Sequence, residues 1–156
     1  MARWSDVLAE APELAALVEQ RFKAHKHAVL ATLRRDGSPR VSGVETQWVF
    51  GDLWMGMMGG SRKALDLLRD PRFALHSAPD DPELPDGDAR VSGRAEAVED
   101  PPRIAAWRGT LEGELTGPFH LFRVDVEEVV TVRVAVDRLV IDRWKAGRGV
   151  VTVERT

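Results

Sequence analysis

The sequence predicts a mainly β protein with peripheral helices, built as an antiparallel barrel or sheet with the helices packed outside. About seven segments have strand patterns, and short turns join most of them. About three stretches have helical spacing, and they do not alternate regularly with the strands, which disfavours a doubly wound parallel sheet. The length of 156 residues is that of one domain, so residues 1–156 are expected to fold together.

The chain begins with helical patterns. Ser5 is placed to cap a first helix, which Pro12 interrupts or restarts. The apolar residues that follow recur at helical spacing and predict one buried stripe: Leu14, Leu17, Val18 and Phe22. Residues 27–33 are a short apolar run that predicts a strand, and Asp36-Gly37 predicts a turn behind it.

A hairpin and a short helix come next. From residue 40 to residue 50 the pattern alternates, and residues 53–58 are the returning strand around a two-residue Gly51-Asp52 turn. The helix that starts near Ser61 is expected to end before Pro71, because the residue before a proline disfavours helical geometry.

The second half is predicted to be mostly strand with one helix. Strands are expected at residues 73–77, 89–98, 119–134 and 139–144. Pro101-Pro102 starts a helix, since proline is tolerated in a first helical turn. Glu127-Glu128 marks a bulge or bend in the long strand, and residues 79–88 form an acidic loop.

Composition limits the class of protein. The net charge is −3, from 22 basic and 25 acidic residues, which argues against a general nucleic-acid-binding protein. No apolar run approaches the roughly 20 residues of a membrane helix, and the first residues carry no signal-peptide pattern, so a cytoplasmic location is expected. The chain has no cysteine, which excludes disulfides, thiolate catalysis and cysteine-bound metals.

The most informative motif is Gly-Gly-Ser-Arg-Lys-Ala-Leu at residues 59–65. Two glycines, a hydroxyl and two cations stand where a strand ends and a helix begins. The N-terminus of a helix favours anions, and Ser61, Arg62 and Lys63 add donors and positive charge. The motif therefore predicts a phosphate site, with a solvated surface turn as the alternative reading.

The hairpin brings a further cation to this motif. If Phe50 pairs with Leu53, paired residue numbers sum to 103 along the hairpin. Arg40 then lies opposite Lys63 and close to the hydroxyl of Ser61. Three cations that converge on a helix start suit a phosphate dianion.

The same register sorts the two faces of the hairpin. One face is expected to point into the core: Val44, Thr46, Trp48, Phe50, Leu53, Met55 and Met57. The other face carries Gln47 and Gly56. Gly56 would let a flat ring approach the backbone, and Gln47 could hydrogen-bond a ring carbonyl or imide. From the pattern alone, the methionines of this strand are core-filling residues.

A set of segments in a fixed order resembles a known family. The segments are Ala31-Thr32-Leu33, Asp36-Gly37-Ser38-Pro39-Arg40-Val41-Ser42, Leu53-Trp54, Ser61-Arg62-Lys63-Ala64 and Asp70-Pro71-Arg72. Together they resemble the pyridoxamine 5′-phosphate oxidase-like superfamily, whose members are flavin-binding split β-barrels. The resemblance is continuous over residues 28–77 and resumes more weakly at residues 90–96.

The resemblance implies an antiparallel split β-barrel that binds FMN, and a homodimer with two cofactor sites at the subunit interface. It implies that the FMN phosphate is held by Arg40, Ser61, Arg62 and Lys63. It implies that the isoalloxazine ring and ribityl chain are lined by Val41, Ser42, Met57 and Met58. We therefore expect a flavin-dependent oxidoreductase acting on a small-molecule substrate, with hydride chemistry carried by the flavin.

The chain departs from the superfamily members that oxidise the vitamin itself. The resemblance implies that those members have an Arg-x-His-type motif near the C-terminus and a glutamine a few residues before the Gly93 position. This chain lacks the histidine, and Asp88 stands at the place of the glutamine. Pyridoxamine phosphate is therefore disfavoured as the substrate, which stays open.

Two alternatives to an FMN enzyme also stay open. A deazaflavin-dependent reductase would need a basic groove for the acidic tail of its coenzyme, with Lys23, Lys26, Arg34 and Arg35 as the candidates. A non-catalytic flavin- or haem-binding protein is the other, and His76 or His120 would then be the haem ligand. No histidine spacing predicts a metal site.

Overall fold

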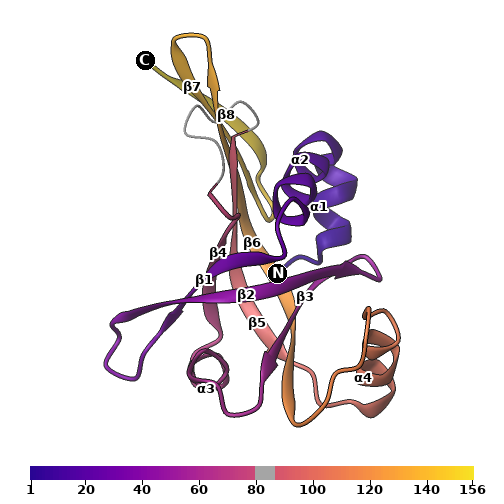
Figure 1. Cartoon of the computed structure of the whole chain (residues 1–156). Helices are drawn as coiled ribbons and strands as arrows, with labels where there is room; N and C mark the ends of the chain where they lie inside the picture. The colour runs from indigo at the N-terminus through magenta and orange to yellow at the C-terminus, as the bar shows by residue number, and fades with distance from the viewer. Residues whose placement is uncertain (80–86) are drawn as a thin grey trace.

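The chain forms one antiparallel sheet whose first six strands close into a barrel (Figure 1). The structure is a computed structural model that describes residues 1–79 and 87–156. The strand order is β3-β2-β1-β4-β5-β6-β7-β8, and a further pairing of β3 with β6 closes the ring. The strands are β1 (His27–Leu33), β2 (Pro39–Val49), β3 (Asp52–Met58), β4 (Arg72–His76), β5 (Asp88–Ala97), β6 (Phe119–Ala135), β7 (Arg138–Lys145) and β8 (Gly149–Arg155). The predicted antiparallel barrel with peripheral helices is confirmed.

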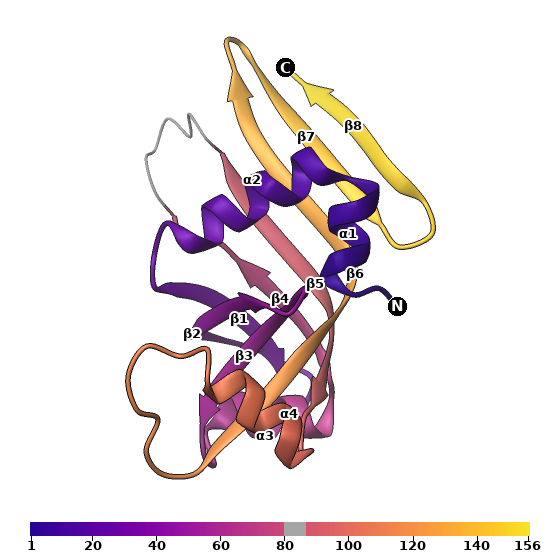
Figure 2. The same ribbon diagram turned by 90° about the vertical axis from the view of Figure 1, so that its right-hand side faces the viewer.

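The helices lie outside the barrel, as Figure 2 shows from the side. They are α1 (Trp4–Glu10), α2 (Pro12–Lys23), α3 (Arg62–Arg69) and α4 (Pro101–Arg108). The predicted cap was wrong, because Ser5 lies inside α1 and the capping position belongs to Arg3, whose backbone N–H donates to Asp6 at 2.8 Å. Pro12 starts α2, where the missing N–H of proline has no helical partner to lose.

The core fills the barrel and has a satellite beneath α4. The barrel interior is packed by fully buried side chains such as Leu30, Leu53, Met55 and Phe122. The satellite lies outside the barrel and consists of Trp54, Val98, Trp107 and Leu121. It fixes α4 over the outer face of β3 and β6.

The predicted hairpin exists, but its turn was placed one residue too late. The turn residues are Phe50 and Gly51, with φ of 56° and 70°, and Val49 pairs with Asp52. Asp52 belongs to the strand because its carboxylate is buried against Arg3 and Arg123. Paired residue numbers therefore sum to 101, as for Thr46 and Met55, and not to 103. A shift of two residues keeps the strand side chains on their predicted faces. The prediction that Phe50 points into the core was wrong, because Phe50 lies in the turn and is 57% exposed.

The long strand β6 leaves the barrel and becomes part of an arm. Its first half pairs with β3 and its second half with β7, and β7 and β8 extend away from the barrel in Figure 1. The predicted bulge is confirmed, because Ser92 pairs with Glu128 while Gly93 pairs with Val126. One last strand was expected after residue 138, whereas the structure has both β7 and β8 there.

The acidic loop predicted at residues 79–88 falls mainly outside the described residues. Residues 80–86 are not described, and Asp88 is the first residue of β5.

Candidate functional site

A cavity of about 330 Å³ lies on the outer face of strands β1, β2 and β3. Its floor contains alternate residues of β2 (Gly43, Glu45 and Gln47) and Gly56 of β3. Residues that alternate with Gly56 along β3, such as Leu53 and Met55, point into the barrel and are buried. The strand period of two therefore separates a barrel core from a cavity floor on the same strands.

The wall of the cavity comes from α4 and from the segment that leads to β6. It includes Trp107, Leu111, Leu115, Thr116, Pro118 and Phe119. A flat ring was predicted to approach Gly56, and a flat ring is there, but it belongs to the protein. A Cβ added at Gly56 would stand 2.9 Å from Cη2 of Trp107. No atom of the described residues lies within 4 Å of the Cβ position at Gly43, so that part of the floor is open to them.

Three polar atoms in and beside this cavity are buried and have no hydrogen-bond partner among residues 1–79 and 87–156. They are Oε1 of Gln47, Nε1 of Trp107 and Oγ of Ser61. A buried polar atom left unpaired costs about 1–3 kcal/mol, so such atoms in a cavity indicate a missing ligand or water. Gln47 was predicted to bind a ring carbonyl or imide, and its amide lines the cavity.

The cation Lys63 lines the cavity and is fixed by the backbone of β2. Its ammonium donates to the carbonyl oxygen of Gly43 at 2.9 Å. An ammonium has three donors, so this contact leaves two of them for an anion.

Arg40 also meets α3, but through a different residue from the one predicted. Its Nε donates to Oδ2 of Asp66 at 2.7 Å instead of lying opposite Lys63. Asp66 is buried, and the same oxygen accepts from Oγ1 of Thr32 at 2.8 Å. Burial raises the pKa of Asp66, but the hydrogen bonds from Arg40 and Thr32 outweigh it and bring that pKa below its usual value. The carboxylate thus holds the Arg40 guanidinium by one edge.

The glycine loop before α3 is bound to the protein itself. The N–H of Gly59 donates to Pro118 O at 3.0 Å, and the N–H of Gly60 donates to Nε2 of His120 at 3.1 Å. The N–H of Ser61 donates to Met58 O at 3.1 Å. These donors are therefore not available to an anion. The first-turn N–H groups of α3 are the backbone donors here that have no acceptor within the helix.

The predicted site residues fall into two groups. Met57, Met58 and Lys63 line the cavity. Arg40, Val41, Ser42, Ser61 and Arg62 lie outside its lining, on β2 and at the start of α3. Sequence reasoning missed Trp107 and the wall that follows it, and it missed Asp66. The only sequence signal for the wall was a glycine in a strand, which permits a close approach without identifying the approaching group.

A pair of titratable residues stands at one side of the cavity. His27 and Glu45 pair across β1 and β2, with 3.7 Å between Nε2 and Oε1. Lys26 reaches the same carboxylate oxygen at 3.5 Å. All three side chains are largely exposed, so the pair is an open feature of the surface.

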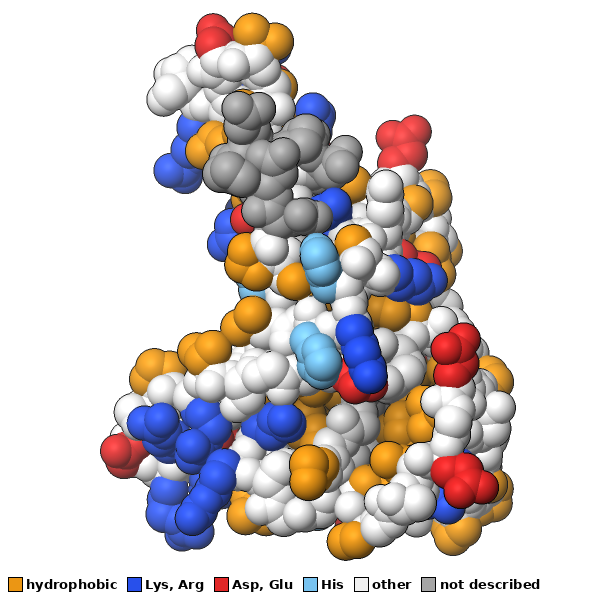
Figure 3. Space-filling view, viewed as in Figure 1, with side chains coloured by type: hydrophobic (Ala, Val, Ile, Leu, Met, Phe, Trp, Pro, Cys, Tyr) orange, Lys and Arg blue, Asp and Glu red, His pale blue; other side chains and the backbone are white. Residues whose placement is uncertain are grey.

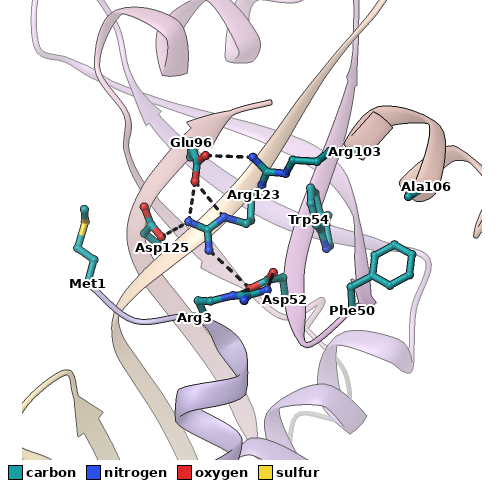
Figure 4. A pocket seen from close by; sticks show the side chains of 10 residues that line it. All are labelled: Met1, Arg3, Phe50, Asp52, Trp54, Glu96, Arg103, Ala106, Arg123 and Asp125. Carbon is teal, nitrogen blue, oxygen red and sulfur yellow. Dashed lines mark hydrogen bonds and ion pairs between the residues drawn. The ribbon is translucent and has the colours of Figure 1, made fainter. Parts of the chain in front are cut away.

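A second cavity, of about 610 Å³, is lined in part by Arg103 and Ala106 of α4 and is shown in Figure 4. Arg123 joins its polar groups, donating to Glu96 at 2.6 Å and to Asp125 at 2.7 Å. Asp52 is paired with Arg3, and Arg103 lies 3.4 Å from Glu96. Three cations thus face three carboxylates, so this network is electrically balanced without a ligand.

A family model for pyridoxamine 5′-phosphate oxidase matches residues 14–133, which is more than half of the chain. The chain therefore belongs to the pyridoxamine 5′-phosphate oxidase family. No curated protein sequence matches the chain.

Solved structures share the fold. PhzG from Burkholderia lata 383, in complex with tetrahydrophenazine-1-carboxylic acid, is 16% identical with a TM-score of 0.69, covering 97% of this chain and 92% of PhzG. A pyridoxamine 5′-phosphate oxidase-related FMN binding protein from Nostoc punctiforme PCC 73102 is 14% identical with a TM-score of 0.65, covering 100% and 98%. An F420 reductase is 24% identical with a TM-score of 0.53, covering 73% and 93%. At these identities the likeness shows the fold alone.

Across residues 1–79 and 87–156, no helix has the length and apolar character needed to cross a membrane. Among the same residues, no group of three or more histidines and carboxylates is placed to hold a metal ion.

Proposed function

We propose that this chain is an FMN-dependent oxidoreductase that transfers hydride through the flavin and works as a homodimer. The observation that supports this most is the cavity beside α3. Lys63 lines it, and the buried polar atoms of Gln47, Trp107 and Ser61 have no hydrogen-bond partner among the described residues. Those groups fit a ligand with both an anionic end and a polar ring.

The phosphate end of FMN would be held where α3 begins. Lys63 has two free donors, and the hydroxyl of Ser61 lacks a partner. Arg40 contributes the N–H groups that Asp66 does not use, and Arg62 adds a nearby exposed charge. A phosphate dianion gains most from cations and helix N–H groups that are already fixed in place.

The ring and ribityl chain would lie along β2 and β3, against Val41, Ser42, Met57 and Met58. When bound, the flavin supplies the hydride chemistry, and the protein binds and orients it. Met57 is buried whereas Met58 is 80% exposed, so the two side chains offer a fixed contact and an adaptable one.

The homodimer is supported by exposed apolar side chains on β2, β3 and α3, the elements that carry the proposed site. Val41 is 70% exposed and Met58 is 80% exposed, and Leu65 and Leu68 on α3 are also exposed. Exposed apolar side chains that cluster beside a site favour a partner surface. A second copy of the chain that covers them would exclude water from the flavin.

A deazaflavin coenzyme is the second candidate, and one surface feature favours it. Lys and Arg side chains gather over the β1–β2 hairpin end and α3, at the lower left of Figure 3. Exposed residues of these elements include Arg34, Arg35, Arg62 and Arg69. Such a surface suits a coenzyme with an acidic tail. The other two cations proposed for that tail, Lys23 and Lys26, are paired with Glu19 and Glu45.

Haem is disfavoured by the contacts of its two candidate ligands. Nε2 of His120 accepts from Gly60, and the ring of His76 lies 2.5 Å from Ser77 O and 3.4 Å from Asp88. Either imidazole would have to give up one of these contacts to reach an iron.

The test is the absorbance spectrum of the purified protein together with the mass of the ligand it carries. An oxidised-flavin spectrum and the mass of FMN support the proposal. A near-ultraviolet deazaflavin band supports the second candidate, and a Soret band overturns both. A protein that binds no flavin even on titration also overturns them.

A further inference from the structure

Two side chains that line the same cavity, one from a strand and one from a helix, carry a hydrogen-bond acceptor and a hydrogen-bond donor. Oε1 of Gln47, on β2, is an acceptor, and Nε1 of Trp107, on α4, is a donor. Both residues line the cavity beside Lys63. Both atoms are buried, and neither has a hydrogen-bond partner in the part of the chain that the structure describes.

The missing partner of Trp107 is unusual within this chain. The indole N–H groups of Trp4, Trp48, Trp54 and Trp144 each donate to an acceptor within 3.3 Å. Trp107 is 2% exposed, so its N–H cannot be satisfied by bulk water. A buried indole N–H without an acceptor destabilises the protein unless a ligand or an ordered water takes it.

Both side chains lie against the outer face of β2 and β3. Cζ2 and Cη2 of Trp107 lie over Gly56, at 3.0 and 2.9 Å from its Cβ position. Cζ2 is joined to Nε1 through Cε2, so the N–H edge of the indole is turned toward the strands. Gln47 projects from the same outer face and pairs with Trp54, next to the pair of Glu45 with Gly56.

We propose that Gln47 and Trp107 bind the edge of a planar amide or imide, in which an N–H donor stands beside a C=O acceptor. The N–H of the ligand donates to Oε1 of Gln47, and its carbonyl accepts from Nε1 of Trp107. Two kinds of ligand have such an edge. One is the pyrimidine edge of the isoalloxazine ring, and this assignment rests on the proposed function. The other is a substrate of the lactam type. A porphyrin has no such edge.

The experiment compares each ligand with its N-methylated form, which keeps the carbonyl and loses the N–H. FMN and N3-methyl-FMN are titrated by flavin fluorescence. 2-Pyridone and N-methyl-2-pyridone are titrated by tryptophan fluorescence on the protein as purified. The variants are Gln47→Met and Trp107→Phe, with Gln20→Met as the control, because Gln20 is the only other glutamine and lies exposed on α2.

If the ring is the ligand, wild type binds FMN at least about tenfold more tightly than N3-methyl-FMN, and Gln47→Met removes that difference. If a lactam is the ligand, the same ratio and the same loss appear for the pyridones and not for the flavins. Trp107→Phe weakens the methylated and unmethylated forms alike, because it removes the contact to the carbonyl.

Equal affinities within both pairs, unchanged by Gln47→Met, would overturn the inference and leave a buried water as the partner. Failure to bind FMN at all would overturn the proposed function, while the pyridone titration would still decide the lactam source. Gln47→Met keeps the test valid if Trp107→Phe does not fold.

Discussion

The Nε of Arg40 donates a hydrogen bond of 2.7 Å to Oδ2 of the buried Asp66, and this contact ties strand β2 to helix α3. Asp66 also accepts from Thr32 at 2.8 Å and lies 3.5 Å from Arg69. One carboxylate therefore fixes the guanidinium that is proposed to hold the cofactor's phosphate. A guanidinium held by one edge keeps its other N–H groups aligned for an anion.

Asp66→Asn is predicted to weaken FMN binding about tenfold or more while riboflavin binding changes little. The amide cannot hold Arg40 as a carboxylate does, and only FMN has a phosphate to lose. Flavin fluorescence titrations measure both affinities. Asp70→Asn is the matched control, since Asp70 pairs with the exposed Arg72. Equal losses for FMN and riboflavin would mean that Asp66 acts on the fold and not on the phosphate.

Asp66 is also predicted to make the stability of the protein depend on acid pH. The folded state lowers the pKa of Asp66, because the hydrogen bonds from Arg40 and Thr32 outweigh the effect of burial. Its stabilisation is therefore complete above the unfolded-state pKa of about 3.9 and is lost as the pH falls through the lower folded-state pKa. Urea unfolding between pH 7 and pH 3 measures this. The curve for Asp66→Asn should be flatter below pH 5, and a parallel curve would contradict the assignment.

The strand faces could be predicted from the sequence, whereas the turn between β2 and β3 could not. Successive side chains of a strand point to opposite faces whatever the pairing register is. Thr46 and Gln47 were therefore assigned to the correct faces even though the predicted register was wrong. The turn position depends on Asp52, which is drawn into the strand by cations far away in sequence, Arg3 and Arg123.

The same limit applies to the candidate site. Arg40 and the cations of the motif at residues 59–65 could be predicted as site residues, because they stand in the same order along the chain as in a known family. Asp66, which holds Arg40, reads in the sequence as an ordinary polar residue of an amphipathic helix. Trp107 reaches Gly56 only because α4 crosses the outer face of the barrel, and no local pattern encodes that crossing.

Arg123→Met is predicted to lower the free energy of unfolding by about 3 kcal/mol or more. The guanidinium is 15% exposed and faces Asp52, Glu96 and Asp125, so its removal leaves three carboxylates close together, and Asp52 among them is 2% exposed. Urea unfolding at neutral pH measures the change. Arg103→Met, at a side chain 41% exposed, is the control and should cost about 1 kcal/mol or less. Similar costs for the two variants would show that burial does not decide the strength of this network.

Val136→Asn is predicted to stabilise the protein by about 1 kcal/mol. Val136 sits in the turn between β6 and β7 with a φ of 56°, a conformation that β-branched residues disfavour, and its side chain is fully exposed. Asparagine tolerates this conformation, and no contact is lost. Thermal unfolding of the whole chain measures the gain. Val136→Ala keeps most of the strain and should give a smaller gain, and a loss of stability in Val136→Asn would contradict the strained turn.

The central claim is that the residues where α3 begins hold the phosphate of FMN, and the ratio of FMN to riboflavin affinity tests it most directly. Both flavins share the ring and the ribityl chain and differ only in the phosphate. Titration of the cofactor-free protein by flavin fluorescence should give an affinity for FMN at least about tenfold higher than that for riboflavin, and Lys63→Met should reduce the ratio. Equal affinities for the two flavins, or a ratio that Lys63→Met leaves unchanged, would contradict the account.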